Sequence, residues 1–214
     1  MTRSHERARM VERQLRGRGI EDERVLAAMG EVPRDDFVPR QLRARAYDDS
    51  ALPISEEQTI SQPWIVAAIC QALALDGSEL VLEVGTGSGY SAAVLGRLAA
   101  HVVTIERHEA LFRAARETLV GLGCGNVETL LGDGSLGVPA GAPFDAIAVH
   151  ATAPGPPQAL LDQLAEGGRL VVPLAAGDAD VLTLYRRRGE QFEAEPITAC
   201  RFVPLIGEGG FAEG

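Results

Sequence analysis

From residue 79 onwards, the chain alternates short β-branched runs with helical segments, and this rhythm restricts the fold more than any other feature. The strand-like runs are 79–84, 101–106, 127–131, 144–149 and 169–173, and the helix-like segments are 88–99, 108–122 and 156–165. Strands joined by helices make right-handed crossovers and pair in parallel. We therefore predict an α/β fold with a mainly parallel, doubly wound sheet covered on both faces.

The two ends of the chain follow other patterns. Residues 181–186 and 192–203 are extended with no helical segment between them, which predicts an antiparallel pair at the edge of the sheet. Residues 5–16 and 22–29 have helical spacing, with Asp22 as a cap for the second helix. Residues 62–75 predict a further helix, with Ser61 at its N-cap and Pro63 in its first turn. The glycine-rich tail at 207–210 predicts a mobile end.

Composition excludes several classes of function. A net charge of −10 over 214 residues argues against nucleic acid or an anionic membrane as a partner. The longest mostly apolar stretch, 64–75, is too short to cross a bilayer. The cysteines at 70, 124 and 200 form no Cys-x-x-Cys pair of the kind found in zinc or redox sites. We expect a cytoplasmic protein with no metal site and no nucleic-acid or membrane partner.

The strongest chemical signal is LEVGTGSGY, residues 82–90, where a strand runs into a glycine-rich turn and then a helix. Gly85, Gly87 and Gly89 allow the backbone to turn tightly and to approach a ligand without Cβ atoms in the way. The spacing is Gly-x-Gly-x-Gly and not the Gly-x-Gly-x-x-Gly of a dinucleotide site. Thr86 lies inside this turn, and Glu83 stands two residues before Gly85, its first glycine.

Acidic residues stand beside the ends of the neighbouring strands. Glu106 ends the second strand, where it can accept hydrogen bonds from both hydroxyls of a ribose. Asp133, followed by Gly134, comes after the third strand and can accept from an exocyclic adenine amine. Together with Glu83, these acids would repel a pyrophosphate and favour a cation. S-adenosylmethionine carries a sulfonium and an amine, so the pattern favours methyl transfer over hydride transfer.

At this point the sequence resembles the protein-L-isoaspartate O-methyltransferases over nearly its whole length. The segments that carry the resemblance are RGIEDERVLAAMGEVPRDDFVP, QTISQPWIVA, VLEVGTGSGYSAAVL, IER, NVETLLGDG, FDAIAVHATAP and ALLDQLAEGGRLVVP. The most specific is QTISQP, which ordinary Rossmann methyltransferases lack. The resemblance implies a Rossmann-like S-adenosylmethionine-dependent fold with an N-terminal helical extension. It also implies a repair enzyme that methylates the α-carboxylate of L-isoaspartyl residues in damaged proteins, after which the ester closes to a succinimide.

The resemblance also implies roles for individual residues. Thr59, Ile60 and Ser61 would form the loop between cofactor and substrate, with Ser61 as the active-site serine of the family. The cofactor would be held by Ile60, Glu83, Gly85, Thr86, Gly87, Gly89, Glu106, Asp133 and Gly134. The bound isoaspartyl protein or peptide would lie along Val203, Pro204 and Leu205. We expect a single-domain monomer with a helical, substrate-side segment (1–77), a cofactor-binding core (78–175) and C-terminal strands with a tail (176–214).

Two features near the proposed serine need explanation. Ser55 stands where many members of the family have glycine, and a left-handed backbone there would strain a serine. Glu56 and Glu57 bring negative charge close to an anionic substrate, which should disfavour its binding unless they face solvent or the positive end of the cofactor.

The chemistry itself requires few catalytic groups. A substrate carboxylate with a pKa near ~4 is already ionised at neutral pH, so no strong general base is needed. We therefore expect the four histidines to be structural or exposed, with His150 the hardest of them to dismiss because it ends the fourth strand. Two alternatives stay open: a relative that methylates an aspartate of one dedicated peptide, and a cofactor-binding module without catalysis or of the NAD type.

Overall fold

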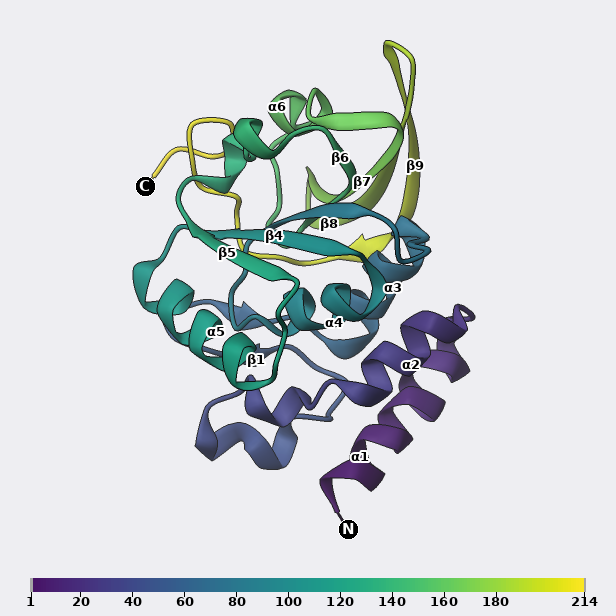
Figure 1. The fold of residues 1–214 in the computed structure, drawn as a ribbon, viewed down its shortest axis with the longest axis vertical. Helices are drawn as coiled ribbons and strands as arrows, with labels where there is room; N and C mark the ends of the chain where they lie inside the picture. Colours follow the sequence, from purple (N-terminus) through teal and green to yellow (C-terminus); the bar gives the residue numbers. More distant parts are fainter. Residues whose placement is uncertain (1, 214) are drawn as a thin grey trace.

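The computed structural model describes residues 2–213, and within them seven strands form one twisted sheet (Figure 1). The strand order is β5–β4–β3–β6–β7–β8–β9, with parallel pairing from β5 to β7 and antiparallel pairing from β7 to β9. The strands are β3 (Leu80–Val84), β4 (His101–Glu106), β5 (Val127–Leu131), β6 (Phe144–Val149), β7 (Leu164–Ala176), β8 (Ala179–Arg188) and β9 (Gln191–Cys200). The predicted α/β sheet with antiparallel C-terminal edge strands is confirmed.

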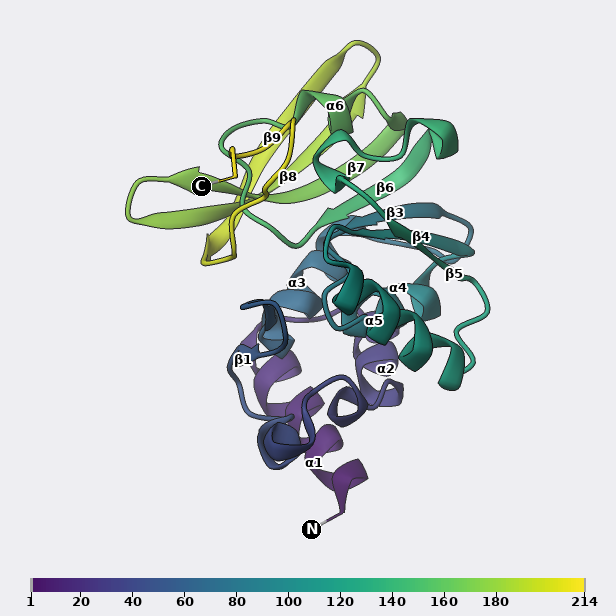
Figure 2. The same cartoon turned by 90° about the vertical axis from the view of Figure 1, so that its left-hand side faces the viewer.

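Helices cover the two faces of the sheet unequally. They are α1 (Arg3–Met10), α2 (Glu23–Glu31), α3 (Pro63–Leu73), α4 (Tyr90–Leu98), α5 (Glu109–Gly121) and α6 (Gln158–Leu161). Helices α2 to α5 lie on one face and the short α6 on the other (Figure 2). The prediction of a helix over 156–165 is too long, because Leu164 already pairs with Phe144 as the first residue of β7.

Two hydrophobic cores, one on each face, account for the apolar strands. Val81 and Val102 point into a core that they share with α3, α4 and the N-terminal helices. Their neighbours Leu82 and Val103 point into a second core, which contains Leu160 of α6. Successive side chains of a strand face opposite sides of a sheet, so strands covered on both faces read as nearly continuous hydrophobic runs.

The N-terminal helices pack onto the sheet as an extension of the first core. Helix α1 continues through a wider helical turn at Val11–Leu15, and Met10 and Leu15 are buried. The Asp22 carboxylate accepts hydrogen bonds from the backbone N–H groups of Arg24 and Val25, which confirms it as the cap of α2. No helix within residues 2–213 is long and apolar enough to cross a membrane.

A short hairpin precedes α3 and changes the role expected of Ser61. Strands β1 (Leu52–Pro53) and β2 (Thr59–Ile60) pair in antiparallel fashion, and the chain stays extended as far as Gln62. Helix α3 begins at Pro63 with Gln62 in the cap position, so the prediction of Ser61 as N-cap is wrong. The physical reason is the proline, because a residue before proline is biased away from helical geometry. Ser61 is therefore not used as a helix cap.

Candidate active site

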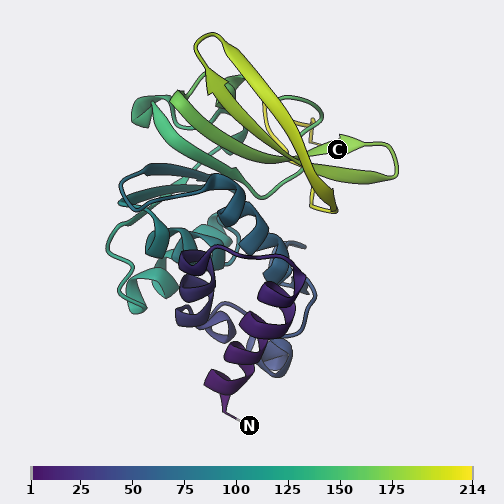
Figure 3. The same ribbon diagram turned by 90° about the vertical axis from the view of Figure 1, so that its right-hand side faces the viewer.

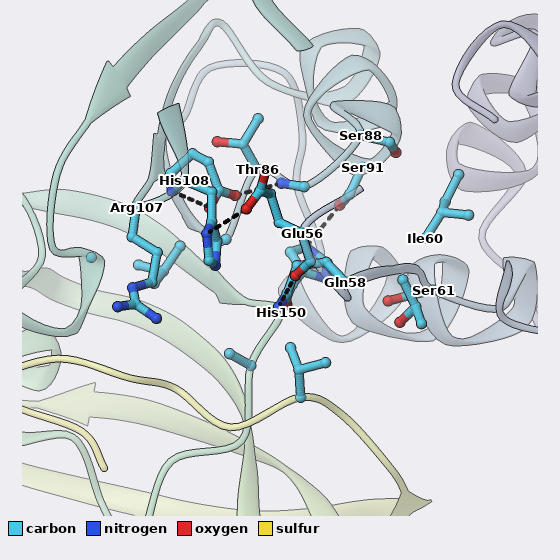
Figure 4. Close-up of a pocket in the computed structure, with 18 of the residues that line it drawn as sticks. Glu56, Gln58, Ile60, Ser61, Thr86, Ser88, Ser91, Arg107, His108 and His150 are labelled. Carbon is cyan, nitrogen blue, oxygen red and sulfur yellow. Dashed lines mark hydrogen bonds and ion pairs between the residues drawn. The ribbon is translucent and has the colours of Figure 1, made fainter. Parts of the chain in front are cut away.

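A cavity of about 440 Å³, here called the main cavity, opens at the carboxyl ends of the parallel strands (Figure 4). Such an edge is the usual ligand crevice of an open α/β sheet. The structure brings the following predicted site residues together along its wall: Thr59, Ile60, Ser61, Gly85, Thr86, Gly87, Glu106, Gly134, Val203, Pro204 and Leu205. Glu83, Gly89 and Asp133 were predicted to bind the cofactor, but they lie behind or beside this wall and do not line it.

The glycine turn between β3 and α4 uses its glycines for two purposes. Gly85, Gly87 and Gly89 all have positive φ, at 91°, 54° and 87°. Gly85 and Gly87 line the main cavity, where missing Cβ atoms leave the backbone accessible to a ligand. Gly89 sits at the N-cap of α4, and a Cβ there would lie 3.3 Å from the Cβ of Ala115. The third glycine therefore serves helix packing.

Glu106 combines burial with remaining hydrogen-bond capacity. It is 5% exposed and lines the main cavity at the end of β4. One carboxylate oxygen accepts from the Gly87 N–H at 2.8 Å and the other from the His108 N–H at 3.0 Å. An ionised carboxylate offers about four acceptor positions, so roughly two remain. Two neighbouring hydroxyls, such as those of a ribose, are donor groups of the kind that suit them.

Glu83 acts behind the glycine turn. It is fully buried, and its Oε2 accepts a hydrogen bond of 2.6 Å from the Thr104 hydroxyl. The Thr86 hydroxyl lies 2.6 Å from the same Thr104 oxygen. Because Thr104 gives its only hydroxyl proton to Glu83, Thr86 must donate to Thr104. Thus Glu83 fixes, through Thr104, the orientation of the Thr86 hydroxyl, and Thr86 lines the cavity whereas Glu83 does not.

His150 is a cavity residue that sequence reasoning treated as structural. It follows β6, lines the main cavity, and places Nε2 2.8 Å from Ser91 Oγ and 3.2 Å from Glu83 Oε1. Glu83 Oε1 has no hydrogen-bond partner within the described residues, so the hydrogen bond of Nε2 is the one to Ser91, in which either atom can donate. The position of His150 after a parallel strand was the available signal. Other cavity residues that were not predicted to bind the cofactor or substrate include Gln58, Ser88, Ser91, Arg107 and His108.

The turn of the β1–β2 hairpin carries backbone strain. The Gln58 N–H donates to the Ser55 carbonyl, and the two central residues, Glu56 and Glu57, both have φ of 56°. Positive φ at both central positions is the pattern of a type I′ turn, which normally takes Asn-Gly. Ser55 is not among the residues with positive φ, so the strain falls on the glutamates instead. Glu56 Oε2 lies 3.8 Å from His108 Nδ1.

The hydroxyls of Thr59 and Ser61 are free to bind a ligand. Both residues line the main cavity, and neither hydroxyl has a hydrogen-bond partner within residues 2–213. Figure 4 shows Ile60 and Ser61 on the side of the cavity away from Arg107 and His108. This arrangement leaves space between the hydroxyls and the turns that follow β3 and β4.

The C-terminal tail packs against the turn after β5, where it was expected to be mobile. Asp133 Oδ1 accepts hydrogen bonds from the backbone N–H and hydroxyl of Ser135, and Oδ2 accepts from the Glu208 N–H at 2.8 Å. Arg107 and Glu213 form an ion pair at the end of the tail. Burial alone would raise the Asp133 pKa, but the hydrogen bonds from Ser135 and Glu208 outweigh it and lower the pKa below its ordinary value.

Comparison with known proteins gives a consistent match over this architecture. The family model described as Protein-L-isoaspartate(D-aspartate) O-methyltransferase (PCMT) matches residues 5–210. The protein-L-isoaspartate O-methyltransferase of Herpetosiphon aurantiacus is 51% identical over 206 residues, covering 96% of this chain and 92% of the relative. That of Methanoregula boonei is 51% identical over 209 residues, covering 98% of this chain and 96% of the relative.

Solved structures agree with this match. A protein-L-isoaspartate O-methyltransferase superposes with a TM-score of 0.86 at 30% identity, covering 95% of this chain and 67% of the other. A Plasmodium falciparum structure assigned to the same enzyme was solved in complex with S-adenosyl-L-homocysteine. It superposes with a TM-score of 0.81 at 24% identity, and the match covers 94% of this chain and 98% of the other, which supports the fold. With the family model matched over 5–210 and relatives at 51% identity along nearly its whole length, the chain belongs to the protein-L-isoaspartate(D-aspartate) O-methyltransferase family.

Proposed function

We propose that this chain methylates the α-carboxylate of L-isoaspartyl residues in damaged proteins with S-adenosylmethionine, and that Thr59 and Ser61 direct the reacting carboxylate. Membership of the family makes the chain a carboxyl O-methyltransferase that uses this cofactor. The observation that carries the residue assignment is that both hydroxyls line the same cavity as the glycine turn and have no partner within residues 2–213.

The residues of the main cavity fit the cofactor. Gly85 and Gly87 leave the backbone open at a point where side chains would otherwise project into the cavity. Glu106 retains acceptor capacity for ribose hydroxyls, and its charge favours a cationic ligand. Gly134 lines the cavity beside Asp133, on the side that we assign to adenine. When bound, S-adenosylmethionine supplies an electrophilic methyl group on a positively charged sulfur.

Thr59 and Ser61 act on the substrate through position and not through proton removal. The substrate carboxylate is already ionised at neutral pH, so its oxygen can attack without a general base. A hydroxyl that donates to one carboxylate oxygen fixes the direction of the other. Ser61 also stands just before the N-terminus of α3, where the helix dipole favours an anion. Orientation of two reacting groups can account for roughly 7–11 kcal/mol of a reaction barrier.

Val203, Pro204 and Leu205 support the substrate side of the proposal. These residues line the main cavity, and the backbone N–H of Leu205 is held by the Thr152 carbonyl at 2.8 Å. They therefore present a fixed wall along which an extended peptide can lie. We further propose a cytoplasmic monomer that forms a single domain and has no nucleic-acid or membrane partner. The core that runs from Met10 to Leu184 supports the single domain, and the net charge of −10 argues against anionic partners.

The test compares two isomeric peptides. Labelled S-adenosylmethionine is supplied with an isoaspartyl peptide or with its normal aspartyl isomer, and base-labile methyl incorporation is measured. We expect incorporation only into the isoaspartyl form, and into several unrelated isoaspartyl sequences. Equal labelling of both isomers, or none, would overturn the proposal. Labelling of a single peptide sequence would favour the dedicated-peptide alternative.

A further inference from the structure

A second, smaller cavity of about 290 Å³ lies on the other side of the active-site hydroxyls; we call it the side groove. Thr59 and Ser61 line the side groove as well as the main cavity. The rest of its wall includes Arg18, Trp64, Thr198, Ala199, Cys200 and Arg201. A substrate whose reacting carboxylate is held at Ser61 would therefore have part of its chain at or beside this groove.

The two cavities differ in charge. The main cavity is lined by the three carboxylates of Glu56, Glu57 and Glu106 and by one arginine, Arg107. This excess of negative charge favours a cationic cofactor. The side groove is lined by Arg18 and Arg201 and contains no carboxylate among its lining residues. This basic lining occurs in a chain whose net charge is −10, so it is not a consequence of overall composition.

The two arginines are held differently. The Arg18 guanidinium pairs with Asp49 at 2.5 Å and packs over the Trp64 ring at 5.0 Å from its centroid. The Trp64 indole N–H in turn donates to the Arg18 carbonyl at 3.2 Å, so this part of the groove is fixed. Arg201 donates only to the backbone carbonyl of Asp178, and no carboxylate lies within 4 Å of it in the described chain. Its remaining N–H donors are free for an anion.

An edge strand runs along the same groove. Thr198, Ala199 and Cys200 are the last residues of β9, which is the outermost strand of the sheet (Figure 3). Within residues 2–213, no further strand pairs with β9 on its outer side. Unpaired backbone groups of an edge strand are a common docking place for an extended peptide.

Building on the proposed function, we propose that the side groove binds the peptide residues next to the isoaspartate and selects an acidic side chain there. Arg201 contributes the free guanidinium, and Arg18, whose charge is balanced by Asp49, adds a wall stacked on Trp64. The hydroxyls of Thr59 and Ser61 thus lie between the acidic main cavity, where the cofactor binds, and the side groove, where Arg201 faces the peptide. A substrate with glutamate beside the target bond is preferred over one with glutamine or lysine.

The test is a peptide scan on the full chain. One isoaspartyl sequence is prepared with Glu, Gln or Lys at each position flanking the isoaspartate, and KM and kcat are measured separately. We expect Glu to lower KM relative to Gln by about three- to tenfold at one or two positions, with kcat unchanged. Raising the salt concentration should reduce the difference, because exposed ion pairs are screened.

Variants show whether Arg201 causes the preference. Arg201→Gln should abolish the advantage of Glu, so that the Glu and Gln peptides have the same KM; the side chain makes one hydrogen bond, to a backbone carbonyl, so the variant should fold. Arg201→Lys keeps the positive charge and should retain part of the KM advantage of the Glu peptide. The control is Arg188→Gln, which removes a surface arginine paired with Glu193 at the opposite end of the β8–β9 hairpin.

Each outcome separates the inference from the function on which it rests. If isoaspartyl peptides are methylated but Glu has no advantage at any position, or if Arg201→Gln leaves the advantage intact, the inference is overturned and the function stands. A preference for Lys would also overturn it. If the native chain methylates no isoaspartyl peptide at all, the proposed function fails first.

Discussion

Two turns border the main cavity, and they reach the same left-handed backbone with opposite residue types. The turn after β3 places Gly85 and Gly87 at positive φ. The turn of the β1–β2 hairpin places Glu56 and Glu57 there. Glycine adopts this geometry without steric cost, whereas an ordinary L-residue is strained by about 1–2 kcal/mol.

The difference indicates what each turn is for. At the glycine turn the absence of side chains is the useful property, because a ligand must approach the backbone. At the hairpin turn, side chains are retained although glycine would be easier to accommodate. Strain at a functional site is a reason to look for a function of the strained residue. The carboxylate of Glu56 lies 3.8 Å from His108 Nδ1, and the backbone N–H of His108 donates to Glu106, so Glu56 reaches the second strand end that borders the cavity.

The largest effect should come from adding a side chain to the glycine turn. In Gly85→Val, a β-branched residue would have to adopt φ near 91° and would project against the Cβ of His150, which lies 3.5 Å from an added Cβ. We expect S-adenosylmethionine affinity to fall by at least about 100-fold, with a lower melting temperature. Titration calorimetry on folded protein checks this. Near-native affinity would show that the backbone there does not approach the cofactor.

A smaller loss should follow from changing the acid that supports the glycine turn. In Glu106→Gln, one oxygen becomes an NH₂ group that cannot accept from the N–H of Gly87 or His108. We expect cofactor affinity to fall by about 10- to 100-fold, which corresponds to a lost hydrogen bond to a charged group. The matched control is Glu109→Gln, an exposed acid at the start of α5. Equal affinities in both variants would remove Glu106 from the cofactor site.

Removing strain from the hairpin turn should stabilise the protein. Glu57→Gly removes the strain of a left-handed L-residue. The greater entropy of glycine in the unfolded chain offsets part of this gain, so we expect the unfolding free energy to rise by about 0.5–1 kcal/mol. Urea unfolding measures the gain. Ser55→Gly is the matched control, since Ser55 has no positive φ and should gain nothing. If both variants were equally stabilised, the strain would not lie at the glutamates.

The smallest effect concerns the turn after β5, which is held by hydrogen bonds and not by left-handed backbone. The native pKa of Asp133 is lowered from 3.8, so its carboxylate stabilises the fold at pH values above 3.8, and this stabilisation is lost as the pH falls through the native pKa. Asp133→Asn should therefore make stability less dependent on pH between about pH 5 and pH 2. Unfolding curves across this range provide the measurement, and an unchanged acid slope would contradict the assignment.

The sequence predicted the glycine turn well because the information is local. A strand, three glycines and a helix follow one another within a few residues, and the acid at Glu106 ends the next strand. Strand bounds at β4, β5 and β6 agree with prediction for the same reason: buried parallel strands are short apolar runs.

The hairpin turn and the tail could not be predicted in this way. Which residues of 55–58 become left-handed depends on the pairing of Leu52 with Ile60, and the strain expected at Ser55 therefore appeared one and two residues later. The tail is ordered by Asp133 and Ser135, which lie more than 70 residues earlier in the chain. Neither contact leaves a local pattern in the sequence.

The most direct measurement of the central claim is methyl transfer by Ser61→Ala, because Ser61 joins the hairpin to the substrate side. Turnover on an isoaspartyl peptide is compared with the native chain, and cofactor affinity is measured on the same sample. We expect turnover to fall by about 10- to 100-fold with cofactor affinity unchanged, as for the loss of a hydrogen bond to a charged group. Full turnover in this variant would contradict the account.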